Sequence, residues 1–128
     1  MAEMVETVDQ AETPPPTYQL LIQVAQPVTV TVGRLDPCSF PAGRYVYTGS
    51  ARRNMAARLA RHLSPHKLLH WHIDYLLTAP GVQVVGTRLF DEPECQINRN
   101  MPGEVLIPGF GSTDCQAGCG SHLKYLGG

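Results

Sequence analysis

The sequence has little charge and few aromatic residues for its length. Only 16% of its 128 residues are Asp, Glu, Lys or Arg, 7% are aromatic, and no block of five like charges occurs. This composition is not typical of a disordered chain or of a strongly basic nucleic-acid-binding protein. Taken alone, the formal net charge of −1 also argues against a DNA partner.

Long apolar runs and an export signal are missing as well. No run of apolar residues is long enough to span a bilayer, and the first residues are acidic where a secretory signal would be basic. We therefore expect a cytoplasmic protein with no membrane partner. The four cysteines are then interpreted as reduced thiols or metal ligands rather than as disulfides.

The charges that are present are unevenly distributed. Residues 1–17 contain four acids, no basic residue and three consecutive prolines, which predicts a flexible acidic tail. All ten Lys and Arg but only seven of the eleven acids lie in residues 18–128, so this predicted domain carries a net charge of +3. Residues 37–73 hold six Lys or Arg, four of the five histidines and no acid. That stretch indicates a surface that binds an anion.

The apolar pattern predicts one small α+β domain, built as a mainly antiparallel sheet flanked by helices. Period-two alternation and β-branched residues predict strands at 18–24, 28–32, 44–48 and 82–90, with a hairpin turn at 25–27 and a last edge strand at 122–126. Helices are expected at 54–63, 72–78 and 92–99, and a Gly- and Pro-rich loop at 102–120.

The predicted helix at 54–63 concentrates potential cations on one side. A helical projection divides it into an apolar stripe that we expect to pack and a basic stripe that we expect to face outward: Ala56, Leu59, Ala60 and Leu63 against Arg58, Arg61 and His62. The basic stripe could be an ordinary solvated face. However, three cations at this spacing repel one another and have no acidic partner on the helix. A bound phosphodiester would explain them better, because Arg pairs well with phosphate oxygens.

Several short motifs follow one another in an order found in a nuclease superfamily. They are PTYQL at 16–20, YVYTGSA at 45–51, RLARH at 58–62, HWHIDY at 70–75, Glu94-Cys95, PGFGSTDC at 108–115 and SHL at 121–123. Together they resemble the GIY-YIG nuclease superfamily, and most closely its small stand-alone branch of Uri-type endonucleases. The resemblance covers nearly everything after the acidic tail.

The resemblance implies a role for each matching residue. Tyr18 and Tyr47 correspond to the signature tyrosines, Arg58 to the catalytic arginine, and His62 to a residue that assists proton transfer. Among the histidines near the tryptophan, His72 is chosen over His70 as a further catalytic group. Residues implied to bind the substrate are Gly49, Ser50, Arg52, Arg53 and Arg61.

The implied cofactor is a divalent metal, Mg²⁺ or Mn²⁺, held by Glu94 as the single carboxylate ligand. The implied reaction is hydrolysis of phosphodiester bonds in DNA that leaves a 5′-phosphate, with RNA as a further substrate class. A tyrosine would help to deprotonate the attacking water, although its usual pKa near 10 requires Arg58 or the metal to lower it. Repair or processing of structured DNA is the expected setting, with a DNA-repair protein as a candidate partner. The sequence leaves the oligomeric state open.

Two departures from the family pattern concern the first signature. It opens with Pro16-Thr17 instead of Gly, and 28 residues lie between Tyr18 and Tyr47. An extra strand at 28–32 would account for the added length and leave both tyrosines on neighbouring strands facing one pocket. Tyr45 is the spare candidate, but we interpret it as a structural strand aromatic.

Other polar residues have competing interpretations. Asp74 could support a neighbouring histidine, but a helix N-terminal acid is the favoured interpretation. A structural Zn²⁺ site could be formed by Cys95, Cys115, Cys119 and His122. Because this set has no CxxC pair, we favour buried free thiols. Two alternative functions follow: a catalytically inactive nucleic-acid-binding module, and a zinc-stabilised interaction domain for a DNA-repair partner.

Overall fold

The computed structural model describes residues 16–33, 35, 37–51, 55–64, 71–107, 110 and 121–128. Its elements are, in chain order, β2 (Thr17–Val24), β3 (Val28–Thr31), β4 (Pro37–Phe40), β5 (Gly43–Ser50), α1 (Met55–Leu63), α2 (His72–Leu77), β6 (Val82–Phe90), α3 (Glu94–Asn100) and β7 (Leu123–Gly127). Of the predicted acidic tail, residues 1–15 lie outside the described residues. The first strand begins at Thr17, one residue before the predicted domain start.

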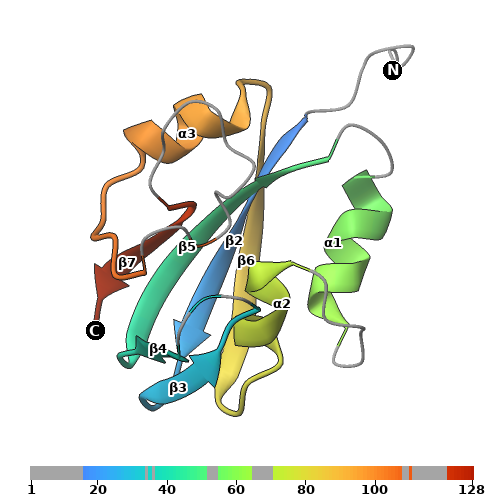
Figure 1. Cartoon of the computed structure of the whole chain (residues 1–128). Helices are drawn as coiled ribbons and strands as arrows, with labels where there is room; N and C mark the ends of the chain where they lie inside the picture. The colour runs from blue at the N-terminus through green and yellow to red at the C-terminus, as the bar shows by residue number, and fades with distance from the viewer. Residues whose placement is uncertain are drawn as a thin grey trace.

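The main sheet is a four-stranded antiparallel sheet in the order β6-β2-β5-β7. Figure 1 shows α1 and α2 toward its β6 side and α3 over the opposite end. The predicted α+β class with a mainly antiparallel sheet is thus confirmed, as is β7 as an edge strand. Among the described residues, no helix is both long and apolar enough to cross a membrane.

The expected hairpin between the first two strands is wrong. β3 pairs with β4 in a separate two-stranded sheet, and β2 pairs instead with β5 and β6. The residues expected to form the turn lead away from the main sheet, and Ala25 N donates to Gly81 O at 2.9 Å. Alternation fixes which side chains share a face of a strand, but it does not specify the partner strand.

β-strand alternation gives the main sheet two chemically different faces. The aromatic face, as we define it, carries Tyr18, Leu20, Ile22, Tyr45, Tyr47 and Gly49, which pair across β2 and β5. The polar face carries Thr17, Gln19, Thr48, His122 and Lys124, of which Gln19 Nε2 donates to Thr48 Oγ1 at 3.2 Å. The side chains of both sets are buried except at Gly49, which has none.

The polar face is joined to α3 through the end of that helix. The ammonium of Lys124 donates to Asn98 O at 2.9 Å and to Met101 O at 3.0 Å, and Asn98 Nδ2 donates to Ser121 O at 2.8 Å. Asn98 O also accepts the N–H of Met101 at 3.2 Å, and a cation at this end of the helix complements the helix dipole. α3 is therefore held by polar bonds over the polar face.

The predicted orientation of α1 is wrong. Met55 and His62 are its buried residues, Arg58 and Leu59 are half-buried, and Leu63 is 56% exposed. The side that packs therefore runs along positions 55, 58, 59 and 62, and the small apolar residues lie outside. Polar contacts favour this orientation, because His62 is hydrogen-bonded to the hydroxyl of Tyr18 and Arg61 donates to the carboxylate of Asp74. A helical projection cannot anticipate partners supplied by other elements.

Candidate functional site

Tyr18, Tyr47 and His62 form a compact cluster on the aromatic face. Tyr18 and Tyr47 lie on the neighbouring strands β2 and β5, and their ring centroids are 6.4 Å apart. His62 from α1 lies 5.3 Å from the Tyr18 ring and 6.4 Å from the Tyr47 ring. Its Nε2 is 2.7 Å from the hydroxyl of Tyr18. The expectation that the inserted residues leave both tyrosines on neighbouring strands facing one site is confirmed.

Burial shapes the acid–base properties of this cluster. It raises the pKa of Tyr18 from 10.0 to about 12, although Arg58 acts in the opposite direction. Burial also raises the pKa of Tyr47 well above 10.0, and the neighbouring Tyr18 adds to this. The expected lowering of the tyrosine pKa by Arg58 is thus outweighed by desolvation. At neutral pH both phenols keep their protons, and the Tyr18 hydroxyl shares a hydrogen bond with His62 Nε2 whose donor depends on the tautomer of the imidazole.

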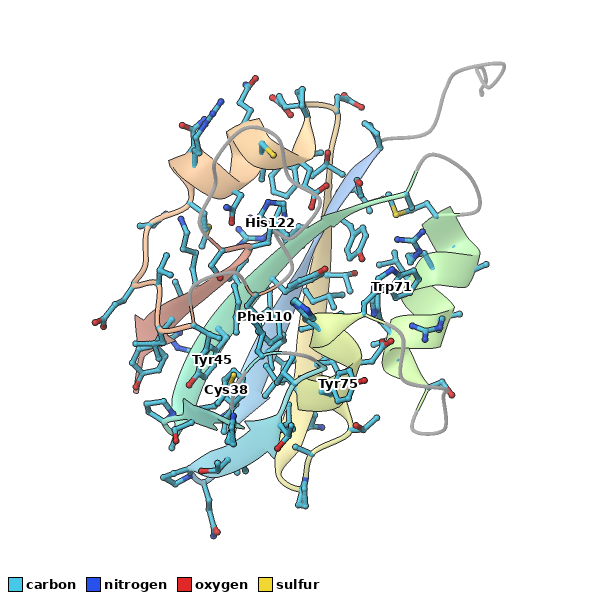
Figure 2. All side chains as sticks on the ribbon, viewed as in Figure 1. Cys38, Tyr45, Trp71, Tyr75, Phe110 and His122 are labelled. Atoms are coloured by element: carbon cyan, nitrogen blue, oxygen red, sulfur yellow. The ribbon has the colours of Figure 1, made fainter. Side chains whose placement is uncertain are left out.

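Arg58 and Arg61 both stack on Trp71. Their guanidinium carbons lie 4.3 Å and 4.4 Å from the centroid of the tryptophan ring, which also lies 5.9 Å from the ring of His62. Figure 2 shows Trp71 against α1. Arg58 Nη1 donates to Ser50 O at 2.8 Å, which ties the helix to the end of β5. The two arginines are therefore held in place by an aromatic plane.

Asp74 is the acidic partner of the arginine pair. It is fully buried, and both of its carboxylate oxygens accept hydrogen bonds from Arg61, at 2.8 and 2.9 Å. The same carboxylate accepts the backbone N–H of Trp71 at 2.8 Å. This hydrogen-bonded pair raises the pKa of Arg61. Asp74 is thus a helix N-terminal acid, as favoured, and it also carries Arg61 as a salt-bridge partner.

Gly49 gives Tyr18 room on the neighbouring strand. A Cβ at position 49 would lie 2.5 Å from both Cζ and the hydroxyl oxygen of Tyr18, closer than such atoms approach. The glycine thus has a packing role beside the predicted role in substrate binding. Ser50 follows at the strand end with its carbonyl on Arg58. Two of the predicted substrate-binding residues, Arg52 and Arg53, lie outside the described residues.

The further histidine and the spare tyrosine lie away from the central cluster. His72 begins α2, and its ring lies 5.7 Å from that of Phe110, which in turn lies 6.4 Å from the ring of Tyr47. Figure 2 shows Phe110 over the middle of the sheet. Tyr45 is buried, and its hydroxyl donates to Pro41 O at 2.6 Å. Its contacts fit the interpretation as a structural aromatic. The competing His70 lies outside the described residues.

Glu94 has contacts of a different kind from those of the tyrosines. It begins α3, its side chain is 24% exposed, and its Oε2 lies 2.5 Å from Nδ1 of His122. Its negative charge contributes to the raised pKa of Tyr18 and of Tyr47, which places it within electrostatic reach of both. Its direct partner, however, belongs to the polar face.

The four residues of the proposed zinc set are brought together only in part within the described residues. Nε2 of His122 lies 3.9 Å from Sγ of Cys95, which is half-buried. Cys115 and Cys119 lie outside the described residues. In the ranges that the structure describes, no group of three or more His, Cys, Asp or Glu side chains could hold a metal ion. Glu94 carries carboxylate oxygens, a type of atom that Mg²⁺ and Mn²⁺ prefer.

Comparison with known protein families identifies one family model that matches the chain. The model of a domain family described as a domain of unknown function, DUF123, matches residues 17–127. The chain belongs to the DUF123 family. Its DUF123 domain includes every described element, from β2 through β7. No curated protein and no solved structure matches the chain.

Two features of the DUF123 domain were missed from the sequence. Trp71 is one, although it is the only tryptophan and stands between two histidines in an acid-free stretch. The other is the contact between Glu94 and His122. Positions 94 and 122 are far apart in the chain, and no periodic pattern links them. Only the pairing of β7 with β5 brings His122 to the start of α3.

Proposed function

We propose that the chain is a divalent-metal-dependent endonuclease of the GIY-YIG type that hydrolyses phosphodiester bonds in DNA. The observation that carries the proposal is the cluster of Tyr18, His62 and Tyr47 with Arg58 alongside. These residues come from three separate elements and converge at one end of the sheet. The motifs that resemble the GIY-YIG superfamily lie on the same residues.

The hydrogen bond between Tyr18 and His62 supports a proton relay. Because the pKa of Tyr18 is raised to about 12, the residue acts as a phenol rather than as a phenolate base. In the proposed step the attacking water gives a proton to Tyr18 Oη while Tyr18 gives its own proton to His62 Nε2. A cavity of about 310 Å³ adjoins His62 and is lined by further residues of α1, α2 and β6.

Arg58 is proposed to stabilise the pentacoordinate phosphorane. Its guanidinium has five N–H donors, and the described hydrogen bond to Ser50 O uses one of them. The tryptophan stack fixes the plane of the group, so that donors are aimed before the substrate arrives. Arg61, in contrast, is bound at both ends of its fork by Asp74 and is proposed to contribute charge rather than a direct contact.

The metal ligand in this proposal is Glu94. Bound Mg²⁺ or Mn²⁺ would neutralise the scissile phosphate and stabilise the leaving 3′-oxygen. A single carboxylate holds such an ion weakly, so the phosphate oxygens of the substrate complete the site. The modest net charge of +3 for residues 18–128 suits a nuclease that relies on DNA structure, or on a DNA-repair partner, for targeting.

The proposal is tested by cleavage assays over a panel of DNA and RNA structures with Mg²⁺ or Mn²⁺ at low salt. Arg58→Ala is expected to lower cleavage about 10²–10³-fold, because it removes the group that stabilises the transition state, while DNA binding is largely kept. Arg44→Ala is the matched control, since it removes the same charge from an exposed position at the far end of β5.

Absence of metal-dependent cleavage on every structure in the panel would sink the proposal. If the parent protein then still bound nucleic acid, the alternative of an inactive binding module would replace it. The raised pKa values of both tyrosines are compatible with that alternative, because they leave almost no phenolate at neutral pH to act as a base. Metal analysis of protein purified without added zinc tests the zinc-stabilised interaction domain.

A further inference from the structure

We propose that His122 is a positioning residue for Glu94, which it holds in the orientation that binds the divalent metal. This inference rests on the proposed metal-dependent function and assigns to the polar face a part in it. Glu94 is the first residue of α3, and the N-cap residue, Pro93, has no side-chain hydrogen bond with which to fix the helix start. The carboxylate of Glu94 has a partner outside the helix, Nδ1 of His122.

His122 is fixed in position by its backbone. Its N–H donates to Phe110 O at 2.8 Å, and its carbonyl accepts the N–H of Thr48 at 3.0 Å. The second bond continues the pairing of β7 with β5 by one residue. The side chain is 2% exposed, so the ring has little space in which to change rotamer. A rigid strand thus presents this imidazole to the start of α3.

Both ring nitrogens of His122 face residues of α3. Nδ1 lies 2.5 Å from Glu94 Oε2, and Nε2 lies 3.9 Å from Cys95 Sγ. The two α3 residues are consecutive, so the ring lies against the start of the helix with Nδ1 in ion-pair range of one carboxylate oxygen. A carboxylate with one oxygen fixed can direct the other toward an ion. Residues that orient a metal ligand in this way typically change metal affinity 10–100-fold when removed.

Glu94 lies on the α3 side of the sheet, whereas the tyrosines of the proposed site lie on the other face. In this inference His122 holds the Glu94 carboxylate in an orientation that reaches the same site. Glu94 is 24% exposed, enough for contact with solvent and substrate, and its charge is felt by Tyr18 and Tyr47. A long side chain at a helix start would otherwise lose considerable conformational freedom on binding a metal. His122 removes much of that freedom in advance.

The test is a Mn²⁺ titration of the full chain saturated with an uncleavable analogue of the best DNA substrate from the panel, because phosphate oxygens complete the proposed site. Free Mn²⁺ is counted by electron paramagnetic resonance, and the binding by that DNA alone is subtracted. His122→Ala is expected to weaken Mn²⁺ binding at least about 10-fold. His122→Asn places an amide N–H near the position of Nδ1, and we expect it to restore most of the affinity. His122→Gln places its amide near Nε2 and is expected not to do so. Cys95→Ala removes the other ring contact and is the matched control, with affinity unchanged.

The outcomes separate this inference from the proposed function. Glu94→Gln must abolish Mn²⁺ binding; if it does not, or if the parent protein binds no Mn²⁺, the proposed metal site itself fails. If Glu94→Gln abolishes binding but His122→Ala binds as the parent does, only the positioning role is overturned. The same holds if His122→Asn is no better than His122→Gln. Because this last comparison uses two amides, it decides the question even if His122→Ala does not fold.

Discussion

The two faces of the main sheet use the same strands for different purposes. On the aromatic face, the rings of Tyr18 and Tyr47 lie near His62 from α1, and the Tyr18 hydroxyl is 2.7 Å from Nε2 of that histidine. On the polar face, Gln19 and Thr48 bond to each other. Further along this face, β7 supplies side chains that hold α3. Neighbouring residues of one strand therefore serve different helices.

Buried polar groups on both faces need hydrogen-bond partners. The chemistry of the partner distinguishes a group suited to proton transfer from a group that only stabilises the fold. Lys124 bonds to backbone carbonyls, which do not take up or release protons near neutral pH. Tyr18 bonds to an imidazole, which does. We therefore expect loss of the Tyr18 hydroxyl to alter the proposed reaction, and loss of the Lys124 ammonium to alter stability.

Of the substitutions that test the difference between the two faces, we expect Tyr18→Phe to have the largest effect. Loss of the hydroxyl breaks the proposed proton relay and is expected to lower the turnover number about 10²–10⁴-fold. The free energy of unfolding should fall by only about 1 kcal/mol, for one lost hydrogen bond. Turnover is measured with the best DNA substrate from the panel, and stability by urea denaturation.

Tyr45→Phe is the control for that substitution. It removes a hydroxyl from the same face, where the partner is the carbonyl of Pro41. Stability should fall by a similar amount while turnover stays at the parent level. Equal losses of turnover in the two variants would contradict the assignment of the relay to Tyr18.

An intermediate effect is expected from Lys124→Met on the polar face. The methionine keeps an apolar stem but removes both hydrogen bonds to the end of α3, so the free energy of unfolding should fall by about 2 kcal/mol. Cleavage by folded protein, measured well below the unfolding temperature, should not change. Arg99→Met, which alters an exposed residue of the same helix, is the control. A loss of cleavage comparable to that of Tyr18→Phe would break the distinction between the faces.

The smallest effect appears only at alkaline pH. Because the folded pKa of Tyr18 is about 12 and its usual value is 10.0, the fold favours the protonated phenol. This contribution to stability is complete below pH 10 and is lost as the pH rises from 10 to 12. An ultraviolet titration of tyrosinate should show that the group missing from Tyr18→Phe is one that ionises near pH 12. If the missing group ionised near pH 10, the buried environment of Tyr18 would be refuted.

The positions of the strands were predicted from the sequence better than the pairing between strands. Strands beginning near Tyr18, Val28 and Val82 were predicted because alternation and β-branched residues mark strands locally. The short strand Pro37–Phe40 was missed, since Pro37, Pro41 and Gly43 gave this stretch the pattern of a loop. Pairing depends on contacts between distant segments, and the wrong hairpin at 25–27 reflects this.

The candidate site was predicted by motif rather than by geometry. Tyr18, Tyr47, Arg58 and His62 were named together, and the structure brings them together. The helical projection placed His62 and Arg61 outward because it weighed apolarity alone. Their partners, Tyr18 and Asp74, lie on other elements and could not enter that calculation.

The close approach of Tyr18 to Gly49 has a consequence for how the site is encoded. The two positions are 31 residues apart in the chain but occupy one volume, because the phenol ring takes the space of the missing side chain. The site therefore requires both residues together, the tyrosine on β2 and the glycine on β5. A larger residue at position 49 would displace the Tyr18 ring, although none of the proposed catalytic residues would itself be changed.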